Sequence, residues 1–204
     1  MRSKVSTATL LAGLLLLASQ AVAQDEVRHE FNVQGTGLFT KDSQGNGITQ
    51  HSTNTGGLLV GYRYHLTRWL AADASYGYGR NTQQNLTSVG SFDVQSNIHQ
   101  ATGAFVLTFP RPVAKIQPFA LAGVGALVFD PTLNAGSFVS GAGRQSRPAF
   151  VYGGGLDYKL TNHIFLRTEY RGLVYNRPDF GLFSLNSDVT THTAQPSAGL
   201  VFRF

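Results

Sequence analysis

The chain has 204 residues, a net charge of +5 and no cysteine. The length suits one domain, and the lack of cysteine excludes disulfides, thiolate metal sites and a lipoprotein anchor. Charged residues make up only 13% of the chain, about half the usual share for soluble domains. The positive charge does not predict nucleic-acid binding, because the sequence has no run or stripe of Lys and Arg.

Residues 1–23 have the features of a cleaved secretory signal peptide. Arg2 and Lys4 give a basic start, Leu10 to Ala18 is apolar, and Ala21-Val22-Ala23 is a small-x-small cleavage site. The alternative is a membrane-spanning helix, but the apolar run is shorter than the ~20 residues that a span needs. We therefore expect a mature protein of residues 24–204 that lies outside the cytoplasm.

The rest of the chain alternates between apolar and polar residues, as half-buried strands do. In the first such segment Phe31 and Val33 point to one face, whereas Glu30 and Asn32 point to the other. The last segment, 197–204, ends with two aromatic residues on one face, Phe202 and Phe204. The eight segments predicted as strands are 30–39, 58–66, 70–79, 99–109, 117–129, 150–159, 164–171 and 197–204.

Short and long connections alternate strictly between these segments. The short ones are His65–Arg68, Pro110–Pro112 and Leu160–His163. These segments of ~8–13 residues are close to the ~9–11 residues of a tilted transmembrane strand, and short turns belong on the periplasmic side of such barrels. Four long polar loops are predicted on the outer side, at about 41–55, 80–97, 130–147 and 176–191.

The predicted fold is all-β, an eight-stranded antiparallel up-and-down transmembrane β-barrel. Only a closed barrel satisfies the strand backbones in lipid, so the segment 197–204 should pair with the segment 30–39. The segment 117–129 is the least regular because both of its faces are apolar; we assign Phe119 and Phe129 to the outer face.

Outward aromatic residues are predicted to form two girdles around an aliphatic band. A soluble β-sandwich also alternates, but it would not sort its aromatic residues into two rings, and its exposed faces would carry more Lys and Glu. The girdle at the short-turn end comprises Phe31, Tyr62, Tyr64, Phe109, Phe119, Tyr158, Phe202 and Phe204, and the girdle at the long-loop end comprises Phe39, Tyr76, Tyr78, Phe129, Phe150 and Tyr152.

Charged residues on the inward positions are the main candidates for function. An eight-stranded barrel is just wide enough for side chains to fill it, so opposite charges should pair there. We favour a structural salt-bridge plug over a narrow ion path, with Arg203 pairing with Glu30 where the barrel closes. The predicted lumen charges are Glu30, Arg63, Asp73, Asp157, Lys159, Arg167, Glu169, Arg171 and Arg203.

Four arginines lie near the outer strand ends, namely Arg80, Arg144, Arg147 and Arg177. They are candidates for bidentate contacts with lipopolysaccharide phosphates, although ordinary solvated loop arginines explain them equally well.

The histidines show no spacing that makes a metal site, and no cofactor is expected. His51, His99 and His192 are predicted near the outer rim. A rim hydrolase that acts on lipids with His and Ser is disfavoured, because His192 has no serine at a matching strand position.

The sequence resembles the small OmpA/OmpX-type outer-membrane β-barrels over residues 27–204. The resemblance is carried by Gly61-Tyr62-Arg63-Tyr64, the strand Asp73–Tyr78, the hairpin Phe150–Tyr170 and the terminal Phe204. It implies a bacterial outer membrane location and contacts with lipid and lipopolysaccharide. It also implies that Phe202 and Phe204 are part of a signal read by the outer-membrane assembly machinery.

The peptidoglycan-binding domain of OmpA-type proteins has no counterpart here, so cell-wall tethering is not expected. The first hypothesis is a non-enzymatic barrel with an envelope-structural role or a role in surface adhesion or recognition through its loops. A narrow pore for ions or small solutes is the alternative, and a lipid-modifying rim enzyme comes third.

Overall fold

The computed structural model describes residues 28–41, 43–45, 48–52, 54–87, 90–109, 115–131, 144–176 and 190–204, with the backbone alone at 43–45, 48–52, 81–87 and 90–95. The predicted signal peptide lies outside these residues. No helix in the described part of the chain is long and apolar enough to cross a membrane.

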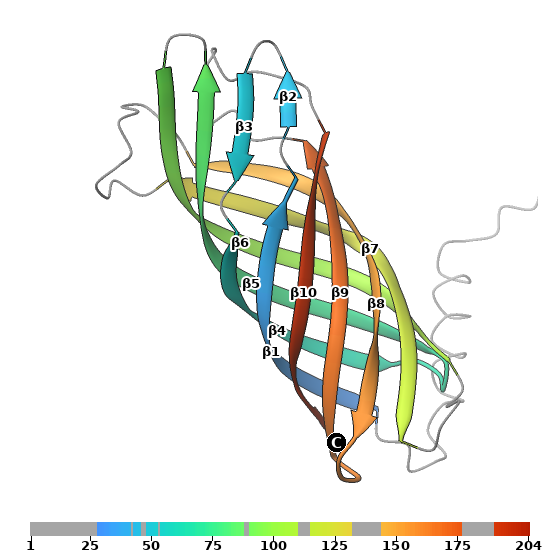
Figure 1. Ribbon diagram of the computed structural model, residues 1–204. Helices are drawn as coiled ribbons and strands as arrows, with labels where there is room; N and C mark the ends of the chain where they lie inside the picture. Colours follow the sequence, from blue (N-terminus) through green and yellow to red (C-terminus); the bar gives the residue numbers. More distant parts are fainter. Residues whose placement is uncertain are drawn as a thin grey trace, which may run out of the picture.

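Eight long strands form a closed antiparallel barrel, as predicted (Figure 1). Each strand pairs with its neighbours along the chain, and the first and last strands pair with each other, from Glu30 opposite Arg203 to Thr40 opposite Thr193. The strands are β1 (His29–Thr40), β4 (Thr55–His65), β5 (Leu70–Thr87), β6 (Gly90–Thr108), β7 (Ile116–Pro131), β8 (Gln145–Lys159), β9 (Ile164–Asn176) and β10 (Thr190–Arg203).

The alternation in the sequence becomes an alternation between the lumen and the outer surface. Phe31 and Tyr62 are each 43% exposed on the outside, whereas Asn32 and Arg63 are buried inside. The outer side of the wall is thus apolar and aromatic, as a surface that faces lipid is, whereas the inner side is packed with side chains.

Two tight turns close the short-turn end at the places predicted. In the β4–β5 turn the Thr67 hydroxyl accepts hydrogen bonds from the backbone N–H groups of Trp69 and Leu70. The Thr161 hydroxyl does the same for His163 and Ile164 in the β8–β9 turn. These local bonds satisfy turn amides that would otherwise lack partners.

The strands at the opposite end run further than the sequence indicated. In the segment 80–97, predicted as a loop, residues 80–87 and 90–97 are paired strand, because β5 and β6 remain in register up to Thr87 opposite Gly90. The segment predicted as a loop at 41–55 contains β2 (Ser43–Gly45) and β3 (Ile48–Ser52), and β3 pairs with β5. Together β2, β3, β5 and β6 form a sheet that projects beyond the barrel (Figure 1).

The face assigned to β7 was wrong. Phe119 and Phe129 are 4% and 0% exposed and point into the lumen, whereas Val124 on the opposite face is 68% exposed. Both faces of this strand are apolar, so alternation alone does not choose between them. The large residues fill the lumen, where they join an apolar cluster with Leu121 and Leu127, and the smaller residues face outward.

Candidate functional site

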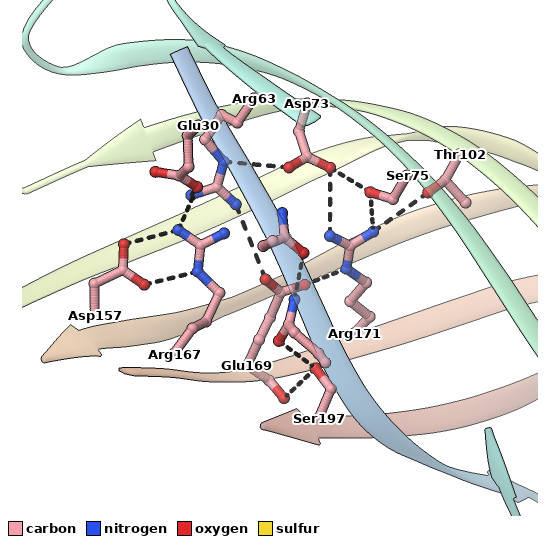
Figure 2. A network of polar contacts seen from close by, with 12 residues as sticks. Glu30, Arg63, Asp73, Ser75, Thr102, Asp157, Arg167, Glu169, Arg171 and Ser197 are labelled. Carbon is pink, nitrogen blue, oxygen red and sulfur yellow. Dashed lines mark hydrogen bonds and ion pairs between the residues drawn. The ribbon is translucent and has the colours of Figure 1, made fainter. Parts of the chain in front are cut away.

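The lumen contains a network of four arginines and four carboxylates, and Figure 2 labels all of them except Arg203. Six strands, β1, β4, β5, β8, β9 and β10, contribute to it. The opposite charges are equal in number, so the network as a whole is neutral. Its members are Glu30, Arg63, Asp73, Asp157, Arg167, Glu169, Arg171 and Arg203.

The part of the network nearest the short-turn end joins Glu30 and Asp157 to two arginines. Arg167 donates from Nε to Asp157 Oδ1 at 2.7 Å and from Nη2 to Glu30 Oε1 at 2.6 Å. Arg203 donates from Nε to Glu30 Oε2 at 2.9 Å and from Nη2 to Asp157 Oδ2 at 2.6 Å. The Glu30–Arg203 pair crosses the β1–β10 seam, where the sequence placed it.

The second part of the network is centred on Arg171. Its guanidinium is paired with Glu169 on the same strand and with Asp73 Oδ1 at 3.3 Å. It also donates to the hydroxyl oxygens of Ser75 at 2.8 Å and Thr102 at 3.3 Å. This one side chain therefore connects β9 to β5 and β6 across the lumen.

Arg63 links the two parts. Its Nε donates to Asp73 Oδ2 at 3.2 Å, and its terminal nitrogens lie 3.6 Å from Glu30 and 3.9 Å from Glu169. The Phe119 ring lies against it, with the guanidinium carbon 4.7 Å from the ring centroid, and Arg167 lies 4.8 Å from the same ring. The ring thus contributes cation–π contacts in a desolvated site.

Sequence reasoning missed this role of Phe119. The signal that indicates it is the glycine run in the neighbouring strand, because Gly155 pairs with Phe119. A Cβ on Gly155 would lie 2.8 Å from Cζ of the Phe119 ring. The missing side chain leaves room for the ring inside the barrel.

Burial removes water from these charged groups, which is unfavourable unless the charges compensate one another. Arg63, Arg167 and Arg171 are 0–1% exposed and are among the largest fully buried side chains. An isolated buried charge is strongly unfavourable, so such groups are stable only when they are paired and hydrogen-bonded. The network can therefore brace the wall and fill the lumen, but each member depends on the others.

Toward the outer end of the barrel, amide and hydroxyl side chains fill the lumen. Gln100 donates to Gln195 at 3.2 Å, and Ser197 donates to Gln34 at 3.0 Å. The predicted site did not include these residues, although they stand at the same inward positions of the alternation as the charges.

Lys159, the remaining predicted lumen charge, stands apart from the network. It lies at the short-turn end on the inward side of β8, two positions after Asp157. Among the described residues it takes part in no ion pair.

The aromatic residues on the outer surface include tyrosines that bond to histidines at both ends of the barrel. The Tyr62 hydroxyl lies 2.6 Å from His29 Nδ1 at the short-turn end. The other predicted girdle residues on the outer surface are Phe31, Phe39, Tyr64, Tyr76, Tyr78, Phe109, Phe150, Tyr152, Tyr158, Phe202 and Phe204, and only Phe119 and Phe129 face inward.

The predicted rim histidines bond to tyrosines rather than to serines. His99 Nδ1 lies 2.6 Å from the Tyr76 hydroxyl, and His192 Nε2 lies 2.9 Å from the Tyr152 hydroxyl. The side chain of His51 lies outside the described part of the structure. The described residues contain no group of three or more His, Cys, Asp and Glu residues arranged to hold a metal ion.

Three of the four outer arginines lie among the described residues. Arg80 is exposed and donates from Nε to Asn97 Oδ1 at 3.0 Å. Arg144 is exposed, Arg147 is half-buried, and Arg177 lies outside the described residues.

A family model for the outer membrane protein beta-barrel domain matches residues 9–204. The chain belongs to this family. It is therefore an outer membrane β-barrel protein of bacteria, as its closed barrel and outward aromatic residues indicate. A search of the curated proteins gave no match.

Solved structures of outer membrane barrels share this fold at low sequence identity. OprG from Pseudomonas aeruginosa is 14% identical with a TM-score of 0.63, covering 86% of this chain and 95% of OprG. Neisserial surface protein A is 13% identical with a TM-score of 0.61, covering 86% and 97%. AlkL, solved in lipid bilayers, is 17% identical with a TM-score of 0.54, covering 90% and 93%.

Proposed function

We propose that this protein is a non-enzymatic outer membrane barrel that presents its external sheet as a surface for adhesion or recognition. The observation that carries the proposal is the pairing of β5 with β6 and of β3 with β5 beyond the barrel rim. A sheet held by backbone hydrogen bonds offers a partner a surface of fixed shape, which limits the entropy lost on binding.

The lumen supports a structural role for the barrel itself. The four arginines and four carboxylates pair across it, and Phe119 packs against two of the arginines. An ion path would instead need polar groups that exchange water for ions, whereas these charges are already bonded to one another. The network therefore favours a plug over a pore.

The contacts of the rim histidines argue against the hydrolase hypothesis. A nucleophilic serine needs a base within hydrogen-bond reach, yet His99 and His192 are bonded to Tyr76 and Tyr152 on the outer surface. Mass spectra of lipid A from cells with and without the gene should therefore be identical, and a new acylation or deacylation product that depends on the gene would contradict this.

Trimming the external hairpin tests the recognition role. Residues 82–95 are replaced by Asn-Gly, which keeps Asn81 opposite Ser96 and forms a two-residue hairpin turn. The trimmed barrel should fold but lose binding of whole cells to immobilised extracellular-matrix proteins and host glycans. Lys115→Gln, at the opposite end of the barrel, is the matched control and should bind like the wild type.

Equal binding by the trimmed and wild-type proteins would show that the external sheet is not the recognition surface. The heat-dependent shift on SDS gels, measured for each variant, shows whether the barrel is folded, so that a folding defect is not mistaken for lost recognition.

A further inference from the structure

A basic pocket opens at the periplasmic mouth of the lumen, away from the external sheet. It has a volume of about 300 Å³ and lies between the β4–β5 turn, the β8–β9 turn and the ends of β7, β8 and β10. Its position below the charge network separates it from the external sheet, which lies at the opposite end of the barrel.

Positive charge dominates the pocket wall. Arg28, Arg68, Lys159 and Arg203 line it together with His65. No Asp or Glu is among the described residues that line it. Such a concentration of one sign of charge in a partly enclosed site attracts and retains anions.

The carboxylates beneath the pocket neutralise Arg203 but not Lys159. Arg203 is bonded to both Glu30 and Asp157, and each of these carboxylates also accepts from Arg167. Lys159, by contrast, takes part in no ion pair among the described residues. The ammonium group of Lys159 is therefore available to an anion.

The pocket is held in shape by contacts that exist without a ligand. The Arg203 guanidinium lies 4.0 Å from the Phe165 ring centroid, and its Nη1 donates to Gln117 Oε1 at 2.9 Å. The hydroxyls of Thr67 and Thr161 fix the turns that carry Arg68 and Asn162. Fixed donors lose less entropy on binding than mobile ones.

We propose that this pocket binds a phosphate group at the periplasmic mouth of the barrel. Guanidinium and ammonium groups suit the several acceptor oxygens and multiple negative charge of a phosphate. The side-chain amide of Asn162, which also lines the pocket, adds a neutral donor. The volume admits a pyrophosphate or a small phosphate ester and excludes a folded macromolecule.

The phosphate has two possible sources, a soluble molecule in the periplasm or a phospholipid headgroup of the inner leaflet. Calorimetric titration of the full barrel with pyrophosphate, in nanodiscs of phosphatidylcholine alone, tests the first source. Binding to phosphatidylglycerol added to the same nanodiscs, and its displacement by pyrophosphate, tests the second. Either result supports the phosphate site and identifies its source.

Lys159→Gln should weaken pyrophosphate binding about tenfold, because it removes a charge-assisted contact. Arg68→Gln should act in the same direction. Lys41→Gln is the matched control, because Lys41 is an exposed lysine at the outer end of β1. Malonate, a dicarboxylate, should bind more weakly than pyrophosphate to the wild type.

Three outcomes would overturn the proposed site. The wild type could bind neither pyrophosphate nor phosphatidylglycerol, or Lys159→Gln could bind as well as the wild type. Equal losses of binding in Lys159→Gln and Lys41→Gln would instead indicate diffuse charge attraction. The heat-dependent gel shift confirms that each variant is folded, and Lys159 lies outside the buried network, so its replacement should not disturb the barrel.

Discussion

Arg167 is the residue on which the lumen network depends most directly. It is fully buried and donates to both Glu30 and Asp157. Its replacement leaves these two carboxylates with fewer partners, although Arg203 still reaches both. The residue therefore contributes to stability through its neighbours as much as through its own contacts.

Arg167→Met should destabilise the folded barrel by about 3–5 kcal/mol, the usual cost of breaking a buried ion pair from one side. Urea unfolding in liposomes, followed by the fluorescence of the single tryptophan, Trp69, measures this. Arg80→Met, at an exposed arginine, is the control and should change the free energy of unfolding little. Equal stabilities of the two variants would show that the network contributes nothing.

Gly155 and Gly103 form a second matched pair. A Cβ on Gly155 would approach Phe119 to 2.8 Å and meet the carbonyl oxygen of Thr168, whereas a Cβ on Gly103 meets no atom within 4 Å. Gly155→Ala should therefore destabilise the barrel by about 1–3 kcal/mol, as overpacking does, while Gly103→Ala should be nearly neutral. The same urea titration checks both, and a neutral Gly155→Ala would mean that the wall adjusts.

The inward charges could be predicted residue by residue where the two faces of a strand differ in polarity. On β9, Arg167, Glu169 and Arg171 alternate with apolar or neutral residues, so the pattern indicates their direction. On β7 both faces are apolar, and Phe119 was assigned to the wrong one. Which large residue fills the lumen depends on space left by other strands, and local alternation does not contain this information.

At the scale of elements, β10 and the residue that follows it, Phe204, close the barrel against the start of β1. The backbone N–H of Phe204 donates to the His29 carbonyl oxygen, and the His29 N–H donates back to Phe204. The Phe204 ring stacks on the His29 ring with centroids 5.8 Å apart. The terminal residue is thus part of the seam.

Deleting Phe204 should impair assembly in cells more than spontaneous folding into liposomes, because the terminal aromatic is expected to be read by the assembly machinery. The heat-modifiable fraction on SDS gels measures both. Normal assembly of the truncated chain in cells would contradict this expectation, and an equal loss in both settings would assign the effect to the seam contacts alone.

The external extensions of β5 and β6 could not be predicted from the sequence. Residues 80–97 are rich in Asn, Gln, Ser and Thr and have no consistent apolar face, so hydrophobic alternation gives no strand signal there. Their pairing instead continues the register set within the barrel, from Leu70 opposite Leu107 to Thr87 opposite Gly90. The barrel therefore fixes the register of the long hairpin that extends from it.

For the whole molecule, architecture follows from sequence more completely than function. Strand number, the antiparallel order of the strands and the closure between Phe31 and Phe202 all rest on a lipid exterior that imposes one pattern on every strand. Recognition of a partner depends on side chains of the outer hairpins, where no such common constraint applies.

We propose that the charge network makes the lumen a plug, and single-channel recording in planar bilayers tests this most directly. The purified wild-type barrel should give a flat current trace across the voltage range. Reproducible open steps from the wild type, abolished by Arg167→Gln, would contradict the claim and establish the lumen as an ion path.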